Sequence, residues 1–162
     1  MSSSPNHPAS IWIKLPAILA IAFCLALGIS FLRWSPSSMA LRYQAIAQKA
    51  LDQKDYQTAI VAASRLLSFG GESRNEALFK LALANLGLGR TADAAGILQI
   101  IAPPDRPVFA PAHLYVARTL LSRAYLSPEM KQAIAAQLEN ALRLEPDSIE
   151  AKELRDRLQN RR

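Results

Sequence analysis

Two short stretches of the chain have the pattern of the same turn between two helices, placed 35 residues apart. One is residues 52–60, DQKDYQTAI, and the other is residues 87–95, GLGRTADAA. A repeat of this length is typical of helix pairs that stack on one another, because a single pair cannot bury its apolar face alone. The spacing predicts an all-α fold, a short helical-repeat α-solenoid, and the usual role of such a stack is to bind another protein.

Helical periodicity continues on both sides of these turns, and no stretch alternates like a strand. Gly70 and Gly71 are suited to the left-handed turn that ends a helix, and prolines at 103, 104 and 107 interrupt the pattern. We expect capping boxes at Ser73/Glu76 and Asp147/Glu150, and an N-cap at Ser127. The expected helices cover residues 40–52, 56–69, 73–86, 91–101, 110–125, 129–144 and 147–159.

An apolar run from Leu15 to Leu32 contains no charged residue. Its eighteen residues would form a helix about 27 Å long, close to the hydrocarbon thickness of a bilayer, with Trp12 and Trp34 at its ends. This predicts a single-pass membrane protein, and a cleavable secretory signal is the alternative. The expected organisation is a disordered tail at 1–10, a transmembrane helix at 11–34, a linker at 35–39 and a repeat domain at 40–162. The side of the membrane that the repeat domain occupies stays open.

The charge balance is basic, with 19 Lys and Arg against 13 Asp and Glu, a net charge of +6. Such a balance favours anionic neighbours, including a lipid surface. The basic residues alternate with acidic ones, except for the arginines at 155, 157, 161 and 162, and this pattern disfavours a nucleic-acid partner.

No motif for catalysis is recognisable. The single cysteine, Cys24, lies in the apolar run and cannot form an intrachain disulfide. The two histidines, His7 and His113, lack the Cys, His or Asp neighbours that a metal site needs, and His113 is interpreted as a surface residue. There is no Gly-rich phosphate loop and no HExxH motif. We therefore expect no enzyme activity, no cofactor and no metal.

The repeated pattern resembles the tetratricopeptide repeat family, whose unit of 34 residues prefers small residues at its eighth and twentieth positions. In residues 40–73 these are Ala47 and Ala59, and in residues 75–108 they are Ala82 and Ala94. A third unit, residues 115–148, is clearest in its end, LENALRLEPDS. Ser122 and Ile134 stand where this third unit would have small residues. The resemblance implies a C-terminal capping helix after the last unit.

The resemblance also implies a concave groove lined by the first helix of each unit. The implied groove residues are Leu41, Gln44, Gln48, Leu51, Glu76, Phe79, Leu83, Leu86, Val116, Thr119, Arg123 and Leu126. The alternative for Phe79, Leu83 and Leu86 is a place in the core between helices, and for Arg123 a pairing with solvent or a neighbouring carboxylate. The Lys and Asn that bind C-terminal carboxylates in some family members are missing.

These features predict a membrane-anchored scaffold that recruits an unidentified partner protein through the groove. One alternative is an accessory subunit that packs against a larger membrane complex through its transmembrane helix. Another is an RNA- or lipid-binding module that uses the basic C-terminal end.

Overall fold

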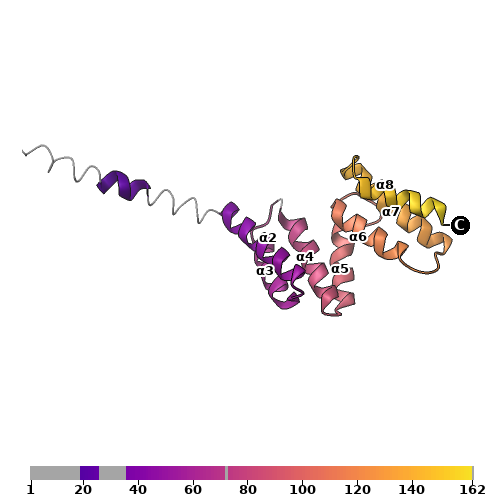
Figure 1. Cartoon of the computed structure of the whole chain (residues 1–162), viewed down its shortest axis with the longest axis horizontal. Coiled ribbons are helices and arrows are strands. Elements are labelled where there is room, and N and C mark those ends of the chain that lie inside the picture. Colours follow the sequence, from indigo (N-terminus) through magenta and orange to yellow (C-terminus); the bar gives the residue numbers. More distant parts are fainter. Residues whose placement is uncertain (1–18, 26–35, 72, 162) are drawn as a thin grey trace, which may run out of the picture. The chain divides into compact units, whose positions relative to one another are not determined.

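The computed structural model describes residues 19–25, 36–71 and 73–161, in which every regular element is an α-helix (Figure 1). This confirms the all-α class for the described part of the chain. The helices are α2 (Pro36–Asp52), α3 (Tyr56–Ser68), α4 (Ser73–Gly87), α5 (Thr91–Ile101), α6 (Ala110–Leu121), α7 (Pro128–Leu144) and α8 (Ile149–Asn160). The chain divides into two compact units, residues 1–42 and 43–162, and all packing described below lies within the second.

The predicted membrane localisation requires a correction. Among the described residues, no helix is both long enough and apolar enough to cross a bilayer. The longest of α2–α8, α2 and α7, have 17 residues each and contain charged side chains, whereas a span takes about 20 mostly apolar residues. Of the expected transmembrane segment 11–34, only the helical residues 19–25 are described. The rest of it and the expected tail at 1–10 lie outside the described residues.

The two turns that the sequence singled out have the same backbone hydrogen bonds. In the first, the N–H of Asp55 donates to the carbonyl of Ala50 at 2.8 Å. In the second, 35 residues later, the N–H of Arg90 donates to the carbonyl of Asn85 at 2.9 Å. The spacing therefore identifies a true structural repeat of the turn that joins α2 to α3 and α4 to α5.

Each of these turns passes through one left-handed residue at the equivalent position. Gly89 has φ +74°, which costs glycine little because it has no Cβ. Lys54 has φ +59° at the same place in the first turn, a conformation that a lysine adopts only under constraint from its surroundings. The glycines predicted to end α3, Gly70 and Gly71, also have positive φ.

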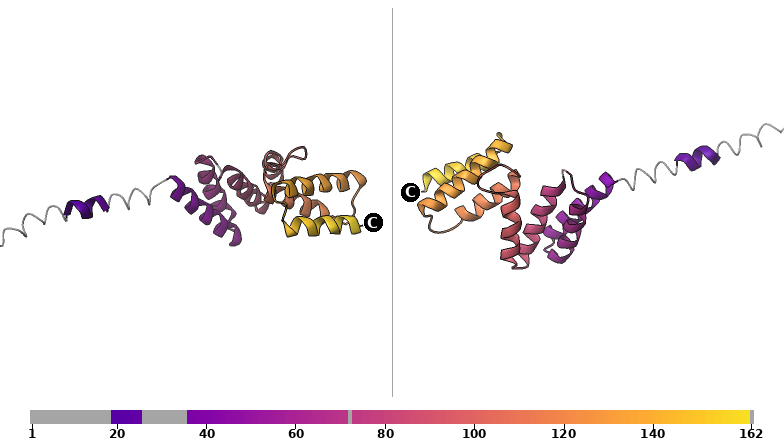
Figure 2. Two further views of the ribbon diagram at one scale, coloured as in Figure 1. Left: turned by 90° about the horizontal axis from the view of Figure 1, so that it is seen from above. Right: turned by 180° about the vertical axis from the view of Figure 1, so that it is seen from behind.

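Small buried residues recur at the same spacing in the helices. Ala47 of α2, Ala82 of α4 and Ala117 of α6 follow one another at intervals of 35 residues, and all three are 0 % exposed. Ala59 and Ala94, the predicted small residues of α3 and α5, are equally buried. Because alanine projects only a methyl group, neighbouring helices can approach closely at these points. The chain thus forms three helical hairpins, α2–α3, α4–α5 and α6–α7, with α8 packed on the third (Figure 2).

The third hairpin departs from the spacing in its second helix. The buried Ile134 of α7 lies 40 residues after Ala94 rather than 35, and the loop 122–127, which follows the end of α6 at Leu121, is longer than the other two turns. The sequence predicted a helix as far as residue 125, and that boundary is wrong. The Ser127 hydroxyl accepts from the N–H of Met130 at 3.3 Å, which confirms the predicted N-cap of α7.

Two other boundaries differ from the prediction. Helix α2 begins at Pro36, inside the segment 35–39 that was expected to be a linker. The N-cap of α8 is Ser148, whose hydroxyl accepts from the N–H of Ala151, so the expected capping box at Asp147 is wrong. Either residue is a favourable N-cap, and a difference of one residue at a helix end is beyond what a pattern can resolve.

Two glycines in helices provide a matched test of this packing. A Cβ at Gly87, the last residue of α4, would overlap the ring of Tyr56, whereas a Cβ at Gly96 in α5 would meet nothing within 4 Å. Chemical denaturation should show Gly87→Ala lowering the free energy of unfolding by about 1–3 kcal/mol through overpacking. Gly96→Ala should raise it by about 0.5–1 kcal/mol through helix propensity. Equal effects of the two substitutions would contradict the close approach of α4 to Tyr56.

Candidate functional site

Two of the predicted groove residues, Gln48 of α2 and Glu76 of α4, belong to a chain of polar contacts. The Lys80 ammonium lies 2.8 Å from the Glu76 carboxylate and donates to the Gln48 side-chain oxygen at 2.6 Å. The Gln48 amide in turn donates to Asp52 at 2.9 Å. Lys80 is only 5 % exposed, so these contacts neutralise and satisfy a buried charge. Sequence reasoning missed Lys80, although its spacing of four residues from Glu76 is typical of an ion pair.

The other predicted residues of α2 differ in exposure. Leu51 packs against a core cluster that contains Ala50 and Ala59, and Gln44 is half-buried. Leu41 is 67 % exposed and belongs to the first unit.

Two residues predicted for the groove do not lie on α6. Arg123 lies in the loop after this helix, and its carbonyl accepts from the Arg161 guanidinium at 2.7 Å. Leu126 is buried in a core cluster with Ile134 and Leu138. The prediction placed the whole third unit by the pattern of its second helix. The long loop 122–127 shifts that helix relative to α6, so the implied positions fell five residues too late.

Residues five positions earlier in the chain, on α6, take their place. Pro111, Leu114 and Arg118 line a hollow of about 550 Å³ together with Phe79 and Leu83 of α4. Phe79 and Leu83 therefore lie on a face shared by α4 and α6. The 35-residue spacing from Ala82 to Ala117 would have found the α6 residues if it had been applied to this helix.

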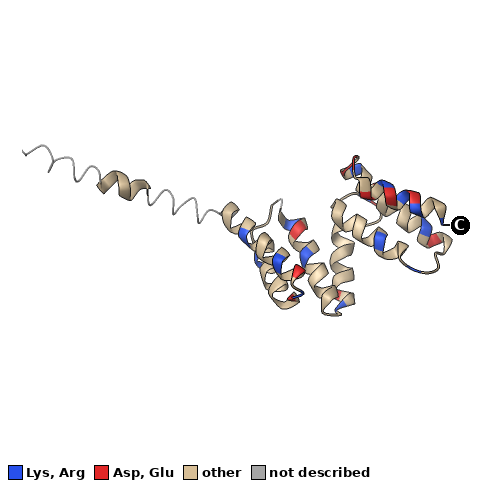
Figure 3. Cartoon of the chain, in the orientation of Figure 1, with Lys and Arg blue, Asp and Glu red and all other residues tan. Residues whose placement is uncertain are grey.

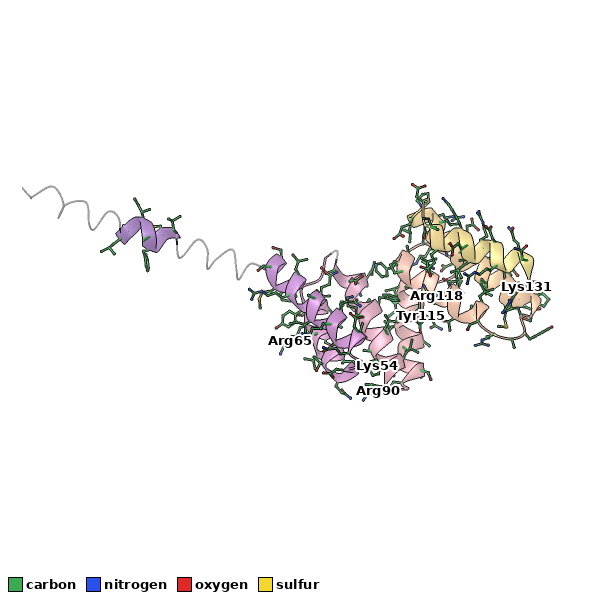
Figure 4. All side chains as sticks on the ribbon, in the orientation of Figure 1. Lys54, Arg65, Arg90, Tyr115, Arg118 and Lys131 are labelled. Carbon is green, nitrogen blue, oxygen red and sulfur yellow. The ribbon has the colours of Figure 1, made fainter. Side chains whose placement is uncertain are left out.

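Aromatic side chains make up part of this hollow. The ring of Phe79 contacts Phe109 and Tyr115 edge to face, with centroid distances of 5.8 and 6.0 Å. Tyr115 and Arg118 lie on neighbouring turns of α6 (Figure 4), and Arg118 forms an ion pair with Glu150 of α8. Sequence reasoning did not single out Tyr115.

A second and more apolar cleft of about 320 Å³ separates the α4–α5 hairpin from the α6–α7 hairpin. Three residues of the predicted groove line it: Leu86, Val116 and Thr119. The remaining lining residues are Thr91, Ala95, Leu98, Gln99, Ala102, Pro104, Tyr115, Leu120 and Gln137. Tyr115 lines both this cleft and the aromatic hollow, so the two adjoin.

No charged residue lines this cleft, and two of its polar side chains, Thr119 and Gln137, already have hydrogen-bond partners. The Thr119 hydroxyl donates to the Tyr115 carbonyl at 2.8 Å, and the Gln137 side chain bonds to His113 and to the carbonyl of Ala102. Figure 3 shows few charges on α5 and α6 and many on α8. An apolar group can therefore enter beside Thr119 and Gln137 without displacing a charge or the hydrogen bonds of these two side chains.

The back of the cleft is held by a buried histidine. His113 is 0 % exposed, which corrects its interpretation as a surface residue. Its Nε2 accepts from the N–H of Val108 at 3.2 Å, so the proton of the neutral ring lies on Nδ1, which donates to the Gln137 side-chain oxygen at 2.6 Å. Burial lowers the pKa of the His113 imidazole, and the hydrogen bond to Gln137 opposes this effect.

The same cluster fixes the proline-rich segment that joins α5 to α6. The Gln137 amide donates to the Ala102 carbonyl at 3.2 Å, and the Asn140 amide donates to the Pro104 carbonyl at 3.1 Å. Proline has no backbone N–H, so this segment cannot form the regular backbone hydrogen bonds that would satisfy its carbonyls. Side chains of α7 donate to these carbonyls instead. Ala102, Pro104 and Gln137, which line the cleft, are thereby held in place.

No protein-family model, curated protein or solved structure matches the chain. The resemblance to tetratricopeptide repeats therefore remains a prediction from the residues, and the function has to be inferred from the geometry of the site.

The lowered pKa of His113 predicts a loss of stability on acidification. The ordinary histidine pKa is 6.5, and the folded value lies below it. As pH falls below about 6.5, the unfolded chain takes up a proton before the folded one, so the free energy of unfolding decreases. The slope from this group is at most about 1.4 kcal/mol per pH unit.

Denaturation of the wild type and of His113→Asn between pH 7.5 and 5.5 measures this slope. Both proteins contain His7, so the difference between them reports His113. We expect a shallower slope in the variant, whatever its absolute stability. Parallel slopes would show that His113 titrates alike in the folded and unfolded states.

Proposed function

We propose that this protein is a helical-repeat scaffold that binds a partner protein through the cleft between the second and third hairpins. The observation that carries the proposal is the absence of charge from the cleft walls together with the satisfied polar groups of Thr119 and Gln137. A surface of this kind favours a bulky apolar side chain, the usual anchor of a protein interface. The proposal assigns no catalytic, cofactor or metal-binding residue.

The repeat character of the scaffold is part of the same proposal. Ala47, Ala82 and Ala117 recur at one spacing, and the turns after α2 and α4 share their hydrogen bonds. Both features support a short α-solenoid of the tetratricopeptide type, with α8 as its capping helix. In such a stack, a ligand contacts side chains from successive first helices, here α4 and α6.

The size of the cleft favours a side chain over a large organic ligand. Its volume of about 320 Å³ lies at the lower end of the range for small-molecule pockets. The adjoining aromatic hollow extends the surface through Tyr115, so a partner that inserts one side chain can also cover Phe79 and Leu83. Surrounding contacts of this kind exclude water from an anchor.

The predicted alternative of an accessory subunit packed through a transmembrane helix is not retained, because it depends on the localisation corrected above. The proposed binding site for a partner protein instead consists of described residues of the helical hairpins.

A photo-crosslinker placed in the cleft tests the proposal. Thr119 is exposed and lines the cleft, so p-benzoylphenylalanine at this position should crosslink full-length protein to a partner in cells. The same group at Gln132, an exposed residue of α7 outside the cleft lining, is the positional control. Equal crosslinking from the two positions would count against the cleft as a binding site.

A charge placed in the cleft should abolish this crosslinking. Ala95 is exposed at the cleft wall, and Ala92 is exposed on the same helix outside the lining. We expect Ala95→Glu to reduce the crosslinked product at least about tenfold, because an apolar anchor would have to desolvate the carboxylate. Ala92→Glu should leave the yield unchanged. Unfolding measurements should place both variants within about 0.5 kcal/mol of the wild type, as is usual for surface substitutions.

A further inference from the structure

A third hollow, of about 430 Å³, lies between α6 and α8, and three arginines line it. We call it the arginine pocket, and its lining residues are Arg118, Leu121, Ser122, Leu154, Arg157, Asn160 and Arg161. No carboxylate is among these residues. Arg157 and Arg161 belong to the basic C-terminal end of the sequence, and the proposed protein-binding cleft does not involve them.

Arg161 is held in a fixed position in this pocket. Its Nη1 donates to the carbonyl of Leu121 at 2.8 Å and to the carbonyl of Arg123 at 2.7 Å. Its own carbonyl accepts from the Lys131 ammonium at 2.9 Å. Two hydrogen bonds therefore place the Arg161 guanidinium before any ligand arrives, and the third holds the backbone of the same residue.

The carbonyls at the end of α6 accept hydrogen bonds from only one nitrogen of this guanidinium, Nη1. Within the described part of the chain, Nη2 and Nε of Arg161 make no hydrogen bond, and neither does the side-chain amide of Asn160. Arg157 lies 4.0 Å from Glu153, which is beyond hydrogen-bond distance. Arg118 alone has a close carboxylate partner, Glu150. The pocket thus collects cationic side chains that still have N–H groups without an acceptor.

A neighbouring hollow extends the same surface. It is lined by Lys131 and by the exposed Tyr125, it shares Arg161 with the arginine pocket, and it too has no carboxylate in its lining. The ammonium of Lys131 adds a fourth cation beside the three guanidinium groups.

We propose that the arginine pocket binds a phosphate group of a small soluble molecule. A guanidinium presents up to five N–H donors in a planar fork that matches phosphate oxygens in pairs. A phosphate group carries more charge and more acceptor oxygens than the single carboxylates that already pair with arginines in this chain. Its oxygens can accept from Arg157, Arg161 and Asn160 at once.

Inorganic pyrophosphate is the probe for this site, used with the full-length protein at pH 7.5. Addition of pyrophosphate should raise the melting temperature in a saturable manner, because a ligand of the folded state stabilises it. Sodium chloride at the same ionic strength is the control for general screening. A rise that sodium chloride reproduces, or one that does not saturate, would overturn the proposal.

A matched pair of arginines locates the effect. Arg157 and Arg143 are both exposed, and each pairs with a glutamate four residues earlier, but only Arg157 lines the pocket. Arg157→Gln should weaken pyrophosphate binding at least about tenfold, the loss expected for one charged hydrogen bond, and Arg143→Gln should not. Equal losses of pyrophosphate binding in the two variants would show that only the net charge matters, and would contradict a defined site.

A short single-stranded RNA, titrated in parallel, separates a compact phosphate ligand from a polyanion. Binding of pyrophosphate with the Arg157 dependence supports the pocket. If RNA alone binds, with affinity falling steeply as salt is added, the surface is a nucleic-acid contact and the small-molecule proposal is overturned.

Discussion

The close approach of helices at small buried residues is the constraint on which the rest of the structure depends. Ala47, Ala82 and Ala117 are each fully buried, one in the first helix of each hairpin, and their constant spacing keeps these helices in register. A larger side chain at any of these three alanine positions would push the neighbouring helices apart, because protein interiors are close-packed and have little free space. The face shared by α4 and α6, with Phe79 and Leu83, exists because this register is maintained.

The cleft between the second and third hairpins lies beside the proline-rich segment that joins them. The proline-rich segment after α5 cannot continue a helix and supplies carbonyls that need donors. Gln137 and Asn140 of α7 provide them, and His113 orients Gln137. A buried polar cluster therefore separates two hairpins by a fixed spacing, and apolar side chains of α5 and α6 line the gap that results.

Charge is divided between two regions of the molecule with different binding properties. The cleft has uncharged walls and suits an apolar anchor, whereas α6 and α8 together gather Arg118, Arg157 and Arg161 around a polar pocket. The cleft and the arginine pocket share no lining residue, whereas Arg118 lines both the arginine pocket and the aromatic hollow that adjoins the cleft. A repeat scaffold of this kind could hold a protein on one surface and respond to an anion on another.

The sequence by itself determined the helical class, the repeated turns and the N-cap at Ser127, because these depend on residues close together in the chain. The tertiary structure decided the register of α6 against α7, the burial of His113 and the pairing of Lys80 with Gln48. The spacing of residues in a sequence does not show where the helices on either side of a longer loop, such as 122–127, end and begin. The partners of a buried polar group come from distant segments, so only the packed fold reveals whether such a group faces water or the core.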